Sequence, residues 1–455
     1  MPSTPLEHIQ NFSTNFSGVS YRVVSPKTVA EVCEIVKEAR ERKEQVHVVS
    51  KAHSYNDVFF TPQRLISLEH FKHISFNKLD KRVSCGAGVT IDELSAYLDR
   101  QGFTLPFAGS YGGQTVVGAL STGTHGYYRG GGGLGECVQK VSLVDGLGKA
   151  QMVSDEKELS AFRCNLGTLG IITQIEMEVQ EKDVVRYQIV SLGIKEFFGR
   201  YKELVAIHDH VRFVISPFSE KIVMAVLIDH IASAKCPLTK GAAYLSDRDF
   251  PTLLLNLSRW VFKRKIVHGI VKLVQSISSV AIDITVPFSS YIFTRNGVVA
   301  QNIFLSQLLH AVFNDPDCLN MSLAIDPSEL EGFYDVFFEH RDRYPQLTDA
   351  NFSMRYMGGS DKVLLGTNYL KDVIVVDVQV SKKNPCSLPF LNELEEKAVS
   401  RFRARPHWGK VFFSEKNTME KVWPRESIQL FKKVKKKYDP DCLFTNPYTV
   451  RVLGI

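Results

Sequence analysis

The sequence predicts an α+β fold in two domains. The 455-residue chain is long enough for two domains, and its 44% apolar and 23% charged residues are an ordinary globular composition. Capped helices and an antiparallel hairpin are expected in its first part, and amphipathic helices with apolar strands in its second. Helices mixed with hairpins favour α+β over a doubly wound parallel sheet.

Three helix starts are visible in the first part of the chain. Thr28 and Glu31 stand at capping-box spacing before a stripe of apolar residues, and Thr90 and Glu93 repeat that spacing. Asp155 is in the position of an N-cap for a short helix that we expect to run through residue 162.

Strands are predicted between these helices. Residues 46–50 form a short apolar run, and residues 138–144 alternate in the manner of a strand. Asp145-Gly146 is a hairpin turn signal, after which residues 150–153 return. A further strand is expected from residue 171 to about 179.

In the second part, residues 328–341 have the apolar spacing of an amphipathic helix and residues 373–380 read as a strongly apolar strand. Residues 423–434 are predicted as the last helix. The lysines at 435–437 are then expected to be a solvated helix end that complements the helix dipole.

The glycine density falls near residues 181–183, and a domain boundary is therefore predicted there. The expected domains are residues 1–182 and 183–455, the second with an antiparallel sheet.

The net charge of +6 is diffuse, with 55 basic and 49 acidic residues, so the charge balance does not indicate a nucleic-acid partner. An anionic cofactor or substrate is sufficient to explain it. The eight cysteines form no C-x-x-C pair and the start Met1 to Pro5 lacks the features of a signal peptide, which favours reduced thiols in a cytoplasmic protein. Asp283 interrupts the longest apolar run, 277–288, so no membrane span is expected.

The glycine-rich stretch 107–126, FAGSYGGQTVVGALSTGTHG, is the feature around which the chain is organised. Its glycines expose backbone N–H groups, which form a concave, partly positive nest, and its hydroxyl side chains add donors. A diphosphate fits such a nest, so the stretch predicts a cradle for a dinucleotide. The glycines are at 109, 112, 113, 118, 123 and 126, and the hydroxyls belong to Thr115, Ser121, Thr122 and Thr124.

Two further motifs lie in order along the chain. The apolar run 46–50 leads directly into Lys51-Ala52-His53-Ser54, and His407-Trp408-Gly409-Lys410 stands near the C-terminus. Together with the S-T-G-T-H-G of residues 121–126, these motifs resemble the flavin-dependent oxidases with a vanillyl-alcohol-oxidase (PCMH-type) FAD domain. Within that superfamily, the chain is most similar to the sugar-1,4-lactone and alditol oxidases, whose H-W-x-K signature it carries.

The resemblance implies a PCMH-type FAD-binding domain followed by an α+β substrate domain that caps the flavin. It also implies FAD as cofactor, and a covalent link from the flavin to a ring nitrogen of His53. The G-x-L-G-I-I of residues 167–172 is implied to lie against the adenosine end. The residues implied to bind FAD are Lys51, Ala52, His53, Ser54, Tyr55, Asn56, Gly109, Ser110, Gly113, Gln114, Thr115, Gly118, Ser121, Thr122, Gly123, Thr124, His125, Gly126, Gly170, Ile171, Ile172 and Asn446.

Oxidation of an alcohol by a flavin needs a group that accepts the hydroxyl proton and a positive charge near the reduced ring. Lys410 is the predicted cation, and His407 is predicted to donate a hydrogen bond or carry a proton. Arg355 matches the arginine of the family's E-x-R pattern, whereas Ser353 replaces its glutamate. The expected catalytic residues are therefore Lys410, Arg355, His407 and Ser353.

The expected reaction is oxidation of a CH–OH group of a sugar lactone, alditol or related polyol, with reoxidation by O2 and release of hydrogen peroxide. Because Ser353 carries no charge, two alternatives stay open. The first is a flavoprotein of the same fold that acts on another alcohol or hydroxy acid. The second is a flavin-binding interaction protein without catalysis.

Three other patterns suggest sites less strongly. Gly86-Ala87-Gly88 lacks the third small residue of a nicotinamide fingerprint, so it is interpreted as a strand-to-helix turn. His208 and His210 could form a metal pair on one strand face, but no third ligand follows, and no metal site is predicted. Residues 259–277 are expected to be a helix of the second domain, with attachment to an anionic membrane surface as the alternative.

Overall fold

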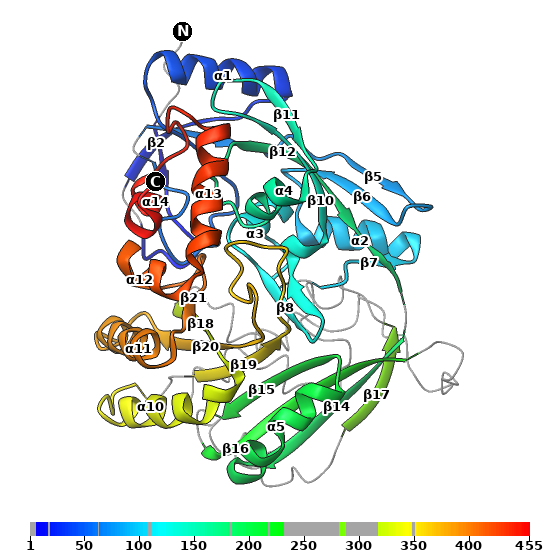
Figure 1. Cartoon of the computed structure of the whole chain (residues 1–455), viewed down its shortest axis with the longest axis vertical. Helices are drawn as coiled ribbons and strands as arrows, with labels where there is room; N and C mark the ends of the chain where they lie inside the picture. The colour runs from blue at the N-terminus through cyan, green and yellow to red at the C-terminus, as the bar shows by residue number, and fades with distance from the viewer. Residues whose placement is uncertain are drawn as a thin grey trace.

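The computed structural model of the chain has two lobes (Figure 1). The first lobe contains the N-terminal sheets and the C-terminal helices, and the second contains one large sheet with three helices. The structure describes residues 6–16, 19–61, 63–107, 109, 111–182, 184–216, 219–231, 282–287, 317–347 and 351–455. The segment 259–277, predicted as a helix, lies outside the described residues. Every helix in the described part is too short or too polar to cross a bilayer.

A four-stranded sheet opens the first lobe in the order β1-β2-β4-β3, in which β4 pairs in parallel with β2 and β3. The crossover from β2 to β3 is helix α1 (Val29–Glu41), whose predicted cap is confirmed because Thr28 accepts the N–H of Glu31. Val32 and Val36 bury the inner face of this helix. The strands are β1 (Leu6–Ile9), β2 (Val19–Val24), β3 (Val46–Val49) and β4 (Arg64–Ser67).

A five-stranded antiparallel sheet follows in the order β11-β10-β12-β6-β5. It contains the predicted hairpin, since Val144 pairs with Ala150 across the Asp145-Gly146 turn. Its strands are β5 (Ile74–Asn77), β6 (Arg82–Gly86), β10 (Val138–Val144), β11 (Ala150–Val153) and β12 (Ile171–Glu178). Helices α2 (Ile91–Gln101) and α4 (Glu156–Phe162) begin at the predicted caps, Thr90 with a complete capping box and Asp155.

The glycine-rich stretch contains a short helix and part of a small ribbon. Helix α3 (Val116–Ser121) begins at Thr115. Strand β8 (His125–Tyr128) then pairs with β9 (Gly131–Gly133), which leads into the 3₁₀ turn η1 (Leu134–Cys137). A second ribbon pairs β7 (Phe103–Thr104) with β13 (Gln180–Glu181), next to the predicted boundary at residue 182. That boundary stays a prediction.

The second lobe is built on an eight-stranded antiparallel sheet with the order β17-β14-β16-β15-β19-β20-β18-β21. Residues of opposite character alternate along its central strands, as the period of two requires. On β19, Phe352 and Met354 belong to an apolar core, whereas Ser353 and Arg355 face the other way. The strands are β14 (Val184–Gly193), β15 (His210–Ser216), β16 (Ser219–Ile231), β17 (Ile282–Pro287), β18 (Cys318–Ile325), β19 (Asn351–Met357), β20 (Val373–Ser381) and β21 (Arg405–Pro406).

Three helices cover the apolar face of this sheet (Figure 1). They are α5 (Ile194–Ile207), α10 (Leu330–Asp342), which follows the 3₁₀ turn η4 (Pro327–Glu329), and α11 (Ser387–Phe402). Helix α10 confirms the amphipathic helix predicted for 328–341, with Phe333 and Phe337 fully buried. Because this face is sealed by helices, the polar face of the sheet is the one that turns toward the first lobe.

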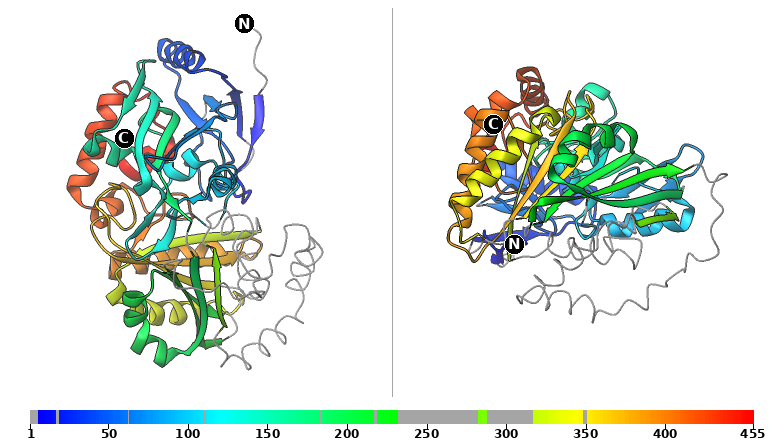
Figure 2. Two further views of the ribbon diagram at one scale, coloured as in Figure 1. Left: turned by 90° about the vertical axis from the view of Figure 1, so that its right-hand side faces the viewer. Right: turned by 90° about the horizontal axis from the view of Figure 1, so that it is seen from below.

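The C-terminal helices return to the first lobe, as Figure 2 shows from two further directions. They are α12 (Lys416–Val422), α13 (Arg425–Tyr438) and α14 (Pro447–Leu453), and their apolar residues join the core of the first lobe. The prediction that 423–434 is the last helix is wrong, because α13 runs four residues further and α14 follows it. A proline at the first helical position and an Asn446 cap start α14.

The prediction of a solvated lysine end is wrong for Lys435. Its side chain is 5% exposed, and its ammonium donates to the Thr168 carbonyl at 2.9 Å and pairs with Asp439. The Asp439 carboxylate also accepts the N–H groups of Leu443 and Phe444 at 2.8 and 2.9 Å. A helix end that faces another segment buries its last turn, and the sequence alone does not show which lysine faces inward.

We expect Asp439→Ala to lower the free energy of unfolding by about 3 kcal/mol or more, because removal of one partner leaves the Lys435 ammonium buried without compensation. Urea unfolding of the full chain measures the loss. The matched control is Asp441→Ala, whose exposed pair with Arg40 should contribute less than about 1 kcal/mol. Equal losses in the two variants would contradict the structural role given to Asp439.

Candidate active site

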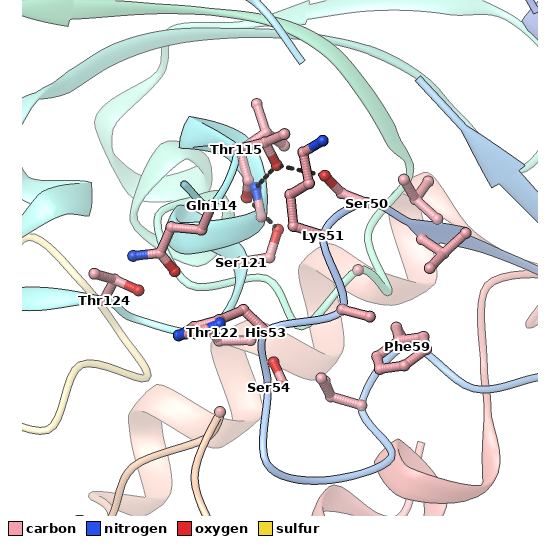
Figure 3. Close-up of a pocket in the computed structure, with 18 of the residues that line it drawn as sticks. Ser50, Lys51, His53, Ser54, Phe59, Gln114, Thr115, Ser121, Thr122 and Thr124 are labelled. Atoms are coloured by element: carbon pink, nitrogen blue, oxygen red, sulfur yellow. Dashed lines mark hydrogen bonds between the residues drawn. The ribbon is translucent and has the colours of Figure 1, made fainter. Parts of the chain in front are cut away.

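A cavity of about 410 Å³ lies where the two lobes meet. Its walls include β3 with the segment that follows it, residues 67–72, residues 87–88, the glycine-rich stretch and residues 165–172. The polar face of the eight-stranded sheet and the loop after β21 complete the lining. Figure 3 shows the first-lobe part of this lining. The labelled residues are Ser50, Lys51, His53, Ser54, Phe59, Gln114, Thr115, Ser121, Thr122 and Thr124.

The loop 50–56 leaves the carboxyl end of β3 and is held from both sides. The N–H of Phe12 donates to the Ala52 carbonyl at 2.7 Å, and the N–H of Tyr55 donates to the Gly409 carbonyl at 2.9 Å. Ala52 takes a left-handed conformation with φ of 45°. Segments more than 300 residues apart therefore fix this loop, and with it the His53 side chain.

The His53 ring lines the cavity between aromatic neighbours. Tyr111 stacks on it with a centroid distance of 4.0 Å and an interplanar angle of 13°, and Phe12 lies 4.3 Å away at a tilt. Burial, with the Lys410 ammonium as the second cause, lowers the pKa of His53 to about 3. The ring is therefore neutral and keeps a nitrogen lone pair at neutral pH.

The glycine-rich stretch forms a hydroxyl-lined wall around the start of α3. Thr115 Oγ1 accepts the N–H of Gly118 at 3.2 Å and the hydroxyl of Ser50 at 3.0 Å. A Cβ on Gly118 would come within 2.8 Å of Thr115 Oγ1, and Gly123 has a φ of +72°. Glycine at 118 therefore avoids a clash with the Thr115 hydroxyl, and glycine at 123 suits the positive φ of the backbone there.

Arg355 and Asp377 form a buried ion pair on the polar face of the large sheet. The Asp377 carboxylate accepts Arg355 Nε at 2.9 Å and Nη2 at 2.7 Å, and its other oxygen accepts the Ser322 hydroxyl. Ser353 stands directly opposite Asp377 in the antiparallel register. Its buried hydroxyl has no hydrogen-bond partner within the described ranges. Arg355 and Ser322 hold the pKa of Asp377 below its usual value despite burial.

Lys410 brings a second cation into the cavity. Its ammonium lies 4.8 Å from the centroid of the Tyr55 ring, in cation–π geometry. The Asn56 amide donates to the carbonyls of Trp408 and Lys410 at 2.6 and 2.8 Å, which fixes this segment to the His53 loop. Burial lowers the pKa of Lys410 to about 8, with Asp377 opposing that shift. Trp408 in the same segment is 1% exposed and packs in the core of the first lobe.

Two imidazoles complete the polar lining. His125 at the start of β8 and His407 after β21 are both buried, and their ring centroids are 5.4 Å apart. Burial lowers the pKa of His125 to about 3 and that of His407 well below its usual value, and the cations Arg355 and Lys410 act in the same direction. Both rings are therefore neutral.

The structure brings together most of the residues that the sequence singles out. Those that line the cavity are Lys51, Ala52, His53, Ser54, Gly109, Gln114, Thr115, Gly118, Ser121, Thr122, Thr124, His125, Gly170, Ile172, Arg355, His407 and Lys410.

The other residues that the sequence predicts for the site are not among the described residues that line the cavity. Ser353 lies on the polar face but behind the cavity wall, and Ser110 is outside the described residues. Asn446 caps α14 and donates to the Val58 carbonyl at 2.7 Å. Also absent from the lining described by the structure are Tyr55, Asn56, Gly113, Gly123, Gly126 and Ile171.

Several lining residues were not found from the sequence. Asp377 is the most informative, because a single acidic residue within the apolar strand 373–381 is a signal that could have been used. Tyr111 and Ser50 are near motifs but have no distinctive pattern of their own. Arg212 on β15 and Asn320 on β18 reach the cavity only through the strand order of the sheet.

The two histidines considered as a metal pair have separate partners. His208 precedes β15 and its Nδ1 is 2.8 Å from Asp229, whereas His210 Nε2 is 3.0 Å from the Nε2 of His230. The described residues contain no group of three or more His, Cys, Asp or Glu arranged to hold a metal ion.

Comparison with known families matches both halves of the site. Residues 21–154 match the family described as FAD binding domain, and residues 348–452 match the family described as D-arabinono-1,4-lactone oxidase. The first match contains the His53 loop and the glycine-rich stretch. The second contains Arg355, Asp377 and Lys410.

Similar proteins include a Neurospora crassa protein named "Putative D-arabinono-1,4-lactone oxidase", 27% identical over 55% of this chain. That alignment spans 48% of the Neurospora protein, so the chain covers about half of its length. The L-gulono-1,4-lactone dehydrogenase of Mycobacterium tuberculosis is 22% identical, with 95% of this chain and 96% of that protein aligned. The L-gulonolactone oxidase of Mus musculus is 22% identical over 97% of both chains.

The fold is shared with solved oxidases. Cholesterol oxidase from Brevibacterium sterolicum superposes with a TM-score of 0.75 at 16% identity, over 99% of this chain and 98% of that chain. Chitooligosaccharide oxidase gives 0.69 at 14% identity, over 97% and 93%. At such identities the likeness concerns the fold alone. The predicted α+β fold with a PCMH-type FAD domain and a cap domain is confirmed.

The fold and the two matched families together define a flavoprotein oxidoreductase with a PCMH-type FAD-binding domain. Its cofactor is FAD. More narrowly, the chain is similar to the aldonolactone oxidases and dehydrogenases, through the domain matched at residues 348–452 and through relatives aligned over nearly its whole length.

The cavity suits this cofactor. FAD is long and carries a central diphosphate, and the cavity wall around α3 offers the hydroxyl side chains of Ser50, Thr115 and Ser121, together with the open surface at Gly118. The polar face of the large sheet adds the Arg355–Asp377 ion pair to the same cavity. We therefore expect Ser50, Thr115 and the glycines near α3 to hold the diphosphate, and His53 to lie beside the ring.

We expect Asp377→Asn to lower the free energy of unfolding by about 3 kcal/mol, because Arg355 would stay buried without its counterion. Because Ser353 faces Asp377 across the register and lies two residues from Arg355, Ser353→Glu in the Asp377→Asn background should restore much of this loss. Thermal unfolding of the wild type, Asp377→Asn and the double variant measures the loss of stability and its recovery.

The matched control for that rescue is Ser353→Glu alone. It would place a second carboxylate next to Asp377 and should destabilise the protein. A double variant less stable than Asp377→Asn would contradict the cross-strand relation between these positions.

Proposed function

We propose that this protein oxidises a CH–OH group of a sugar lactone, an alditol or a related polyol, with O2 as the oxidant of the reduced flavin and hydrogen peroxide as product. The observation that carries the proposal is the arrangement of charges beside the polar face of the eight-stranded sheet, which is here called the cap sheet. There, the Arg355–Asp377 pair and Lys410 share the cavity that the glycine-rich stretch and His53 line.

FAD, when bound, would supply the acceptor for the hydride of the substrate C–H bond. Lys410 and Arg355 supply fixed positive charge at the site where negative charge develops, on the ring and on the substrate oxygen. A preorganised cation in a site that excludes water stabilises such charge far more than a solvated one does. Asp377 positions Arg355, since two of its guanidinium nitrogens donate to one carboxylate oxygen.

The character of the cavity favours a hydroxyl-rich substrate. Asn320 on β18 and Asp377 on the neighbouring strand β20 line the cavity, and Arg212 on β15 adds a further cation to the cavity wall. The side-chain oxygen of Asn320 is buried without a hydrogen-bond partner among the described residues, so a substrate hydroxyl can satisfy it, whereas an apolar alcohol would leave it unpaired at a cost of about 1–3 kcal/mol. The lactone substrates in the names of the sequence relatives agree with this inference.

Anaerobic titration of the purified yellow protein tests the proposal. A panel of L-gulono-1,4-lactone, D-arabinono-1,4-lactone and alditols should bleach the flavin, and aerobic turnover should release hydrogen peroxide. Bleaching only by another alcohol or hydroxy acid would support the alternative function, a flavoprotein of the same fold with a different substrate. The uncharged Ser353, in place of the family's glutamate, permits that alternative. A flavin reduced by dithionite and by no substrate would identify a flavin-binding protein without catalysis.

We expect Lys410→Met to slow substrate reduction of the flavin by at least about a hundredfold, comparable to the loss of one oxyanion donor. Lys410→Arg, which retains the charge, should lose much less. Stopped-flow absorbance under anaerobic conditions measures both rates. An unchanged rate in Lys410→Met would remove this residue from the mechanism.

We expect the rate of flavin reduction to depend on pH through the charge of Lys410. Burial lowers the pKa of Lys410 to about 8, so its positive charge is complete below that pH and is lost as the pH rises through it. The rate of flavin reduction in the wild type should therefore fall above about pH 8. In Lys410→Arg the fall should be absent, because a guanidinium keeps its proton there.

A covalent link between FAD and His53 belongs to the proposal, because the ring is neutral, buried and held by the Tyr111 stack. After acid precipitation and proteolysis, the yellow colour should stay on the peptide that contains His53. In His53→Ala the colour should pass into the supernatant. Complete release of colour from the wild type would exclude the link.

A further inference from the structure

We propose that His125 accepts the proton of the hydroxyl group that is oxidised, while His407 donates a hydrogen bond to the oxygen of that hydroxyl. This inference rests on the proposed function, because it assigns roles within the same site. It depends on the hydrogen bonds that fix the two rings in opposite tautomers.

The backbone of β8 sets the tautomer of His125. Its Nδ1 lies 2.9 Å from the carbonyl oxygen of Gly126. A carbonyl oxygen only accepts, so Nδ1 carries the hydrogen of this bond. A neutral imidazole has one N–H group, and Nε2 of His125 is therefore a lone-pair acceptor.

The loop after β21 sets the opposite tautomer in His407. The N–H of Gly409 donates to Nδ1 of His407 at 3.1 Å, so that nitrogen carries a lone pair and Nε2 carries the hydrogen. Both rings line the cavity, and neither Nε2 forms a hydrogen bond within the described ranges. An acceptor and a donor thus lie on rings 5.4 Å apart, and a hydroxyl group can satisfy both.

The charges around the two rings keep them neutral. Arg355 on β19 and Lys410 beyond β21 disfavour a further positive charge, and they outweigh Asp377 on β20 when burial is added. The pKa of His125 is lowered to about 3. Its lone pair is therefore available throughout the neutral range.

Two other ionisable groups beside these rings do not compete for the proton. The two carboxylate oxygens of Asp377 accept bonds from Arg355 and Ser322. Lys410 is a cation at neutral pH, because its pKa is about 8. His125 Nε2 has no hydrogen bond within the described ranges and faces the cavity with a lone pair, so it is available to take the proton.

The O–H bond of the substrate breaks and its proton forms a bond to His125 Nε2. The C–H bond breaks and its electron pair leaves with the hydrogen as hydride to the flavin, while the C=O bond of the product forms. Burial and the cations Arg355 and Lys410 disfavour the protonated ring, so it returns its proton to solvent after product leaves.

The test compares the wild type with His125→Gln, whose amide keeps polarity near the position of Nε2 but takes up no proton. With a lactone or alditol that bleaches the wild type, anaerobic flavin reduction at saturating substrate should slow by about a hundredfold or more. The substrate concentration for half-saturation should change little. The exposed His70→Gln is the control and should reduce at the wild-type rate.

The pH profile separates proton transfer from a structural role. Without an internal acceptor, the His125→Gln rate should rise about tenfold per pH unit between about pH 5 and 7.5, as hydroxide ionises the substrate, whereas the wild-type rate stays flat. A flat profile in His125→Gln, or a rate equal to that of the wild type, would overturn the inference. Failure of the proposed function would look different, since the wild type itself would not be bleached.

A second measurement does not depend on turnover. In protein labelled with ¹⁵N-histidine and loaded with FAD, nitrogen–hydrogen correlation spectra should show the hydrogen on Nδ1 of His125 and on Nε2 of His407. The His125→Gln and His407→Gln variants assign the two signals. A hydrogen on Nε2 of His125 would contradict the proposed acceptor, whatever the substrate.

Discussion

The buried ion pair of Arg355 and Asp377 is the constraint on which the site depends. Each charge alone would be expensive to bury, so the two must stay within hydrogen-bond distance in a dry environment. Cross-strand neighbours in a rigid antiparallel sheet meet that requirement. The helices α5, α10 and α11 seal the other face of that sheet, and so direct the charged face toward the first lobe. The charge that a flavin reaction needs is thereby supplied before any substrate enters.

The second requirement is that segments distant in sequence keep fixed positions. The His53 loop is bonded to the N-terminal segment through Phe12 and to the C-terminal segment through Tyr55 and Asn56. Through these bonds, the position of His53 depends on the same segment that carries His407 and Lys410. A shift of any one segment would therefore alter both the predicted flavin attachment and the predicted cation. This dependence accounts for the wide spacing of the motifs along the chain.

Much of the fold could be predicted from local sequence, because caps, turns and apolar periodicity act over a few residues. The helices that begin at Thr28 and Thr90 and the 138–153 hairpin are examples. Asp377 could not be placed, since its pairing with Arg355 depends on strand register, which local sequence does not encode. The burial of Lys435 and the existence of α14 likewise depend on what the C-terminus packs against. The motif residues could be found because their order along the chain resembles that of a known family, and the segments matched to the two families contain the same motifs.

The central claim is that FAD lies between the glycine-rich stretch and the charged face of the cap sheet. A crystal structure of the purified yellow protein tests it most directly. The account predicts density for a diphosphate at residues 109–125 and for a flavin ring between His53 and the Arg355–Asp377 pair. A flavin bound elsewhere, or a colourless folded protein whose cavity is filled by its own side chains, would contradict it.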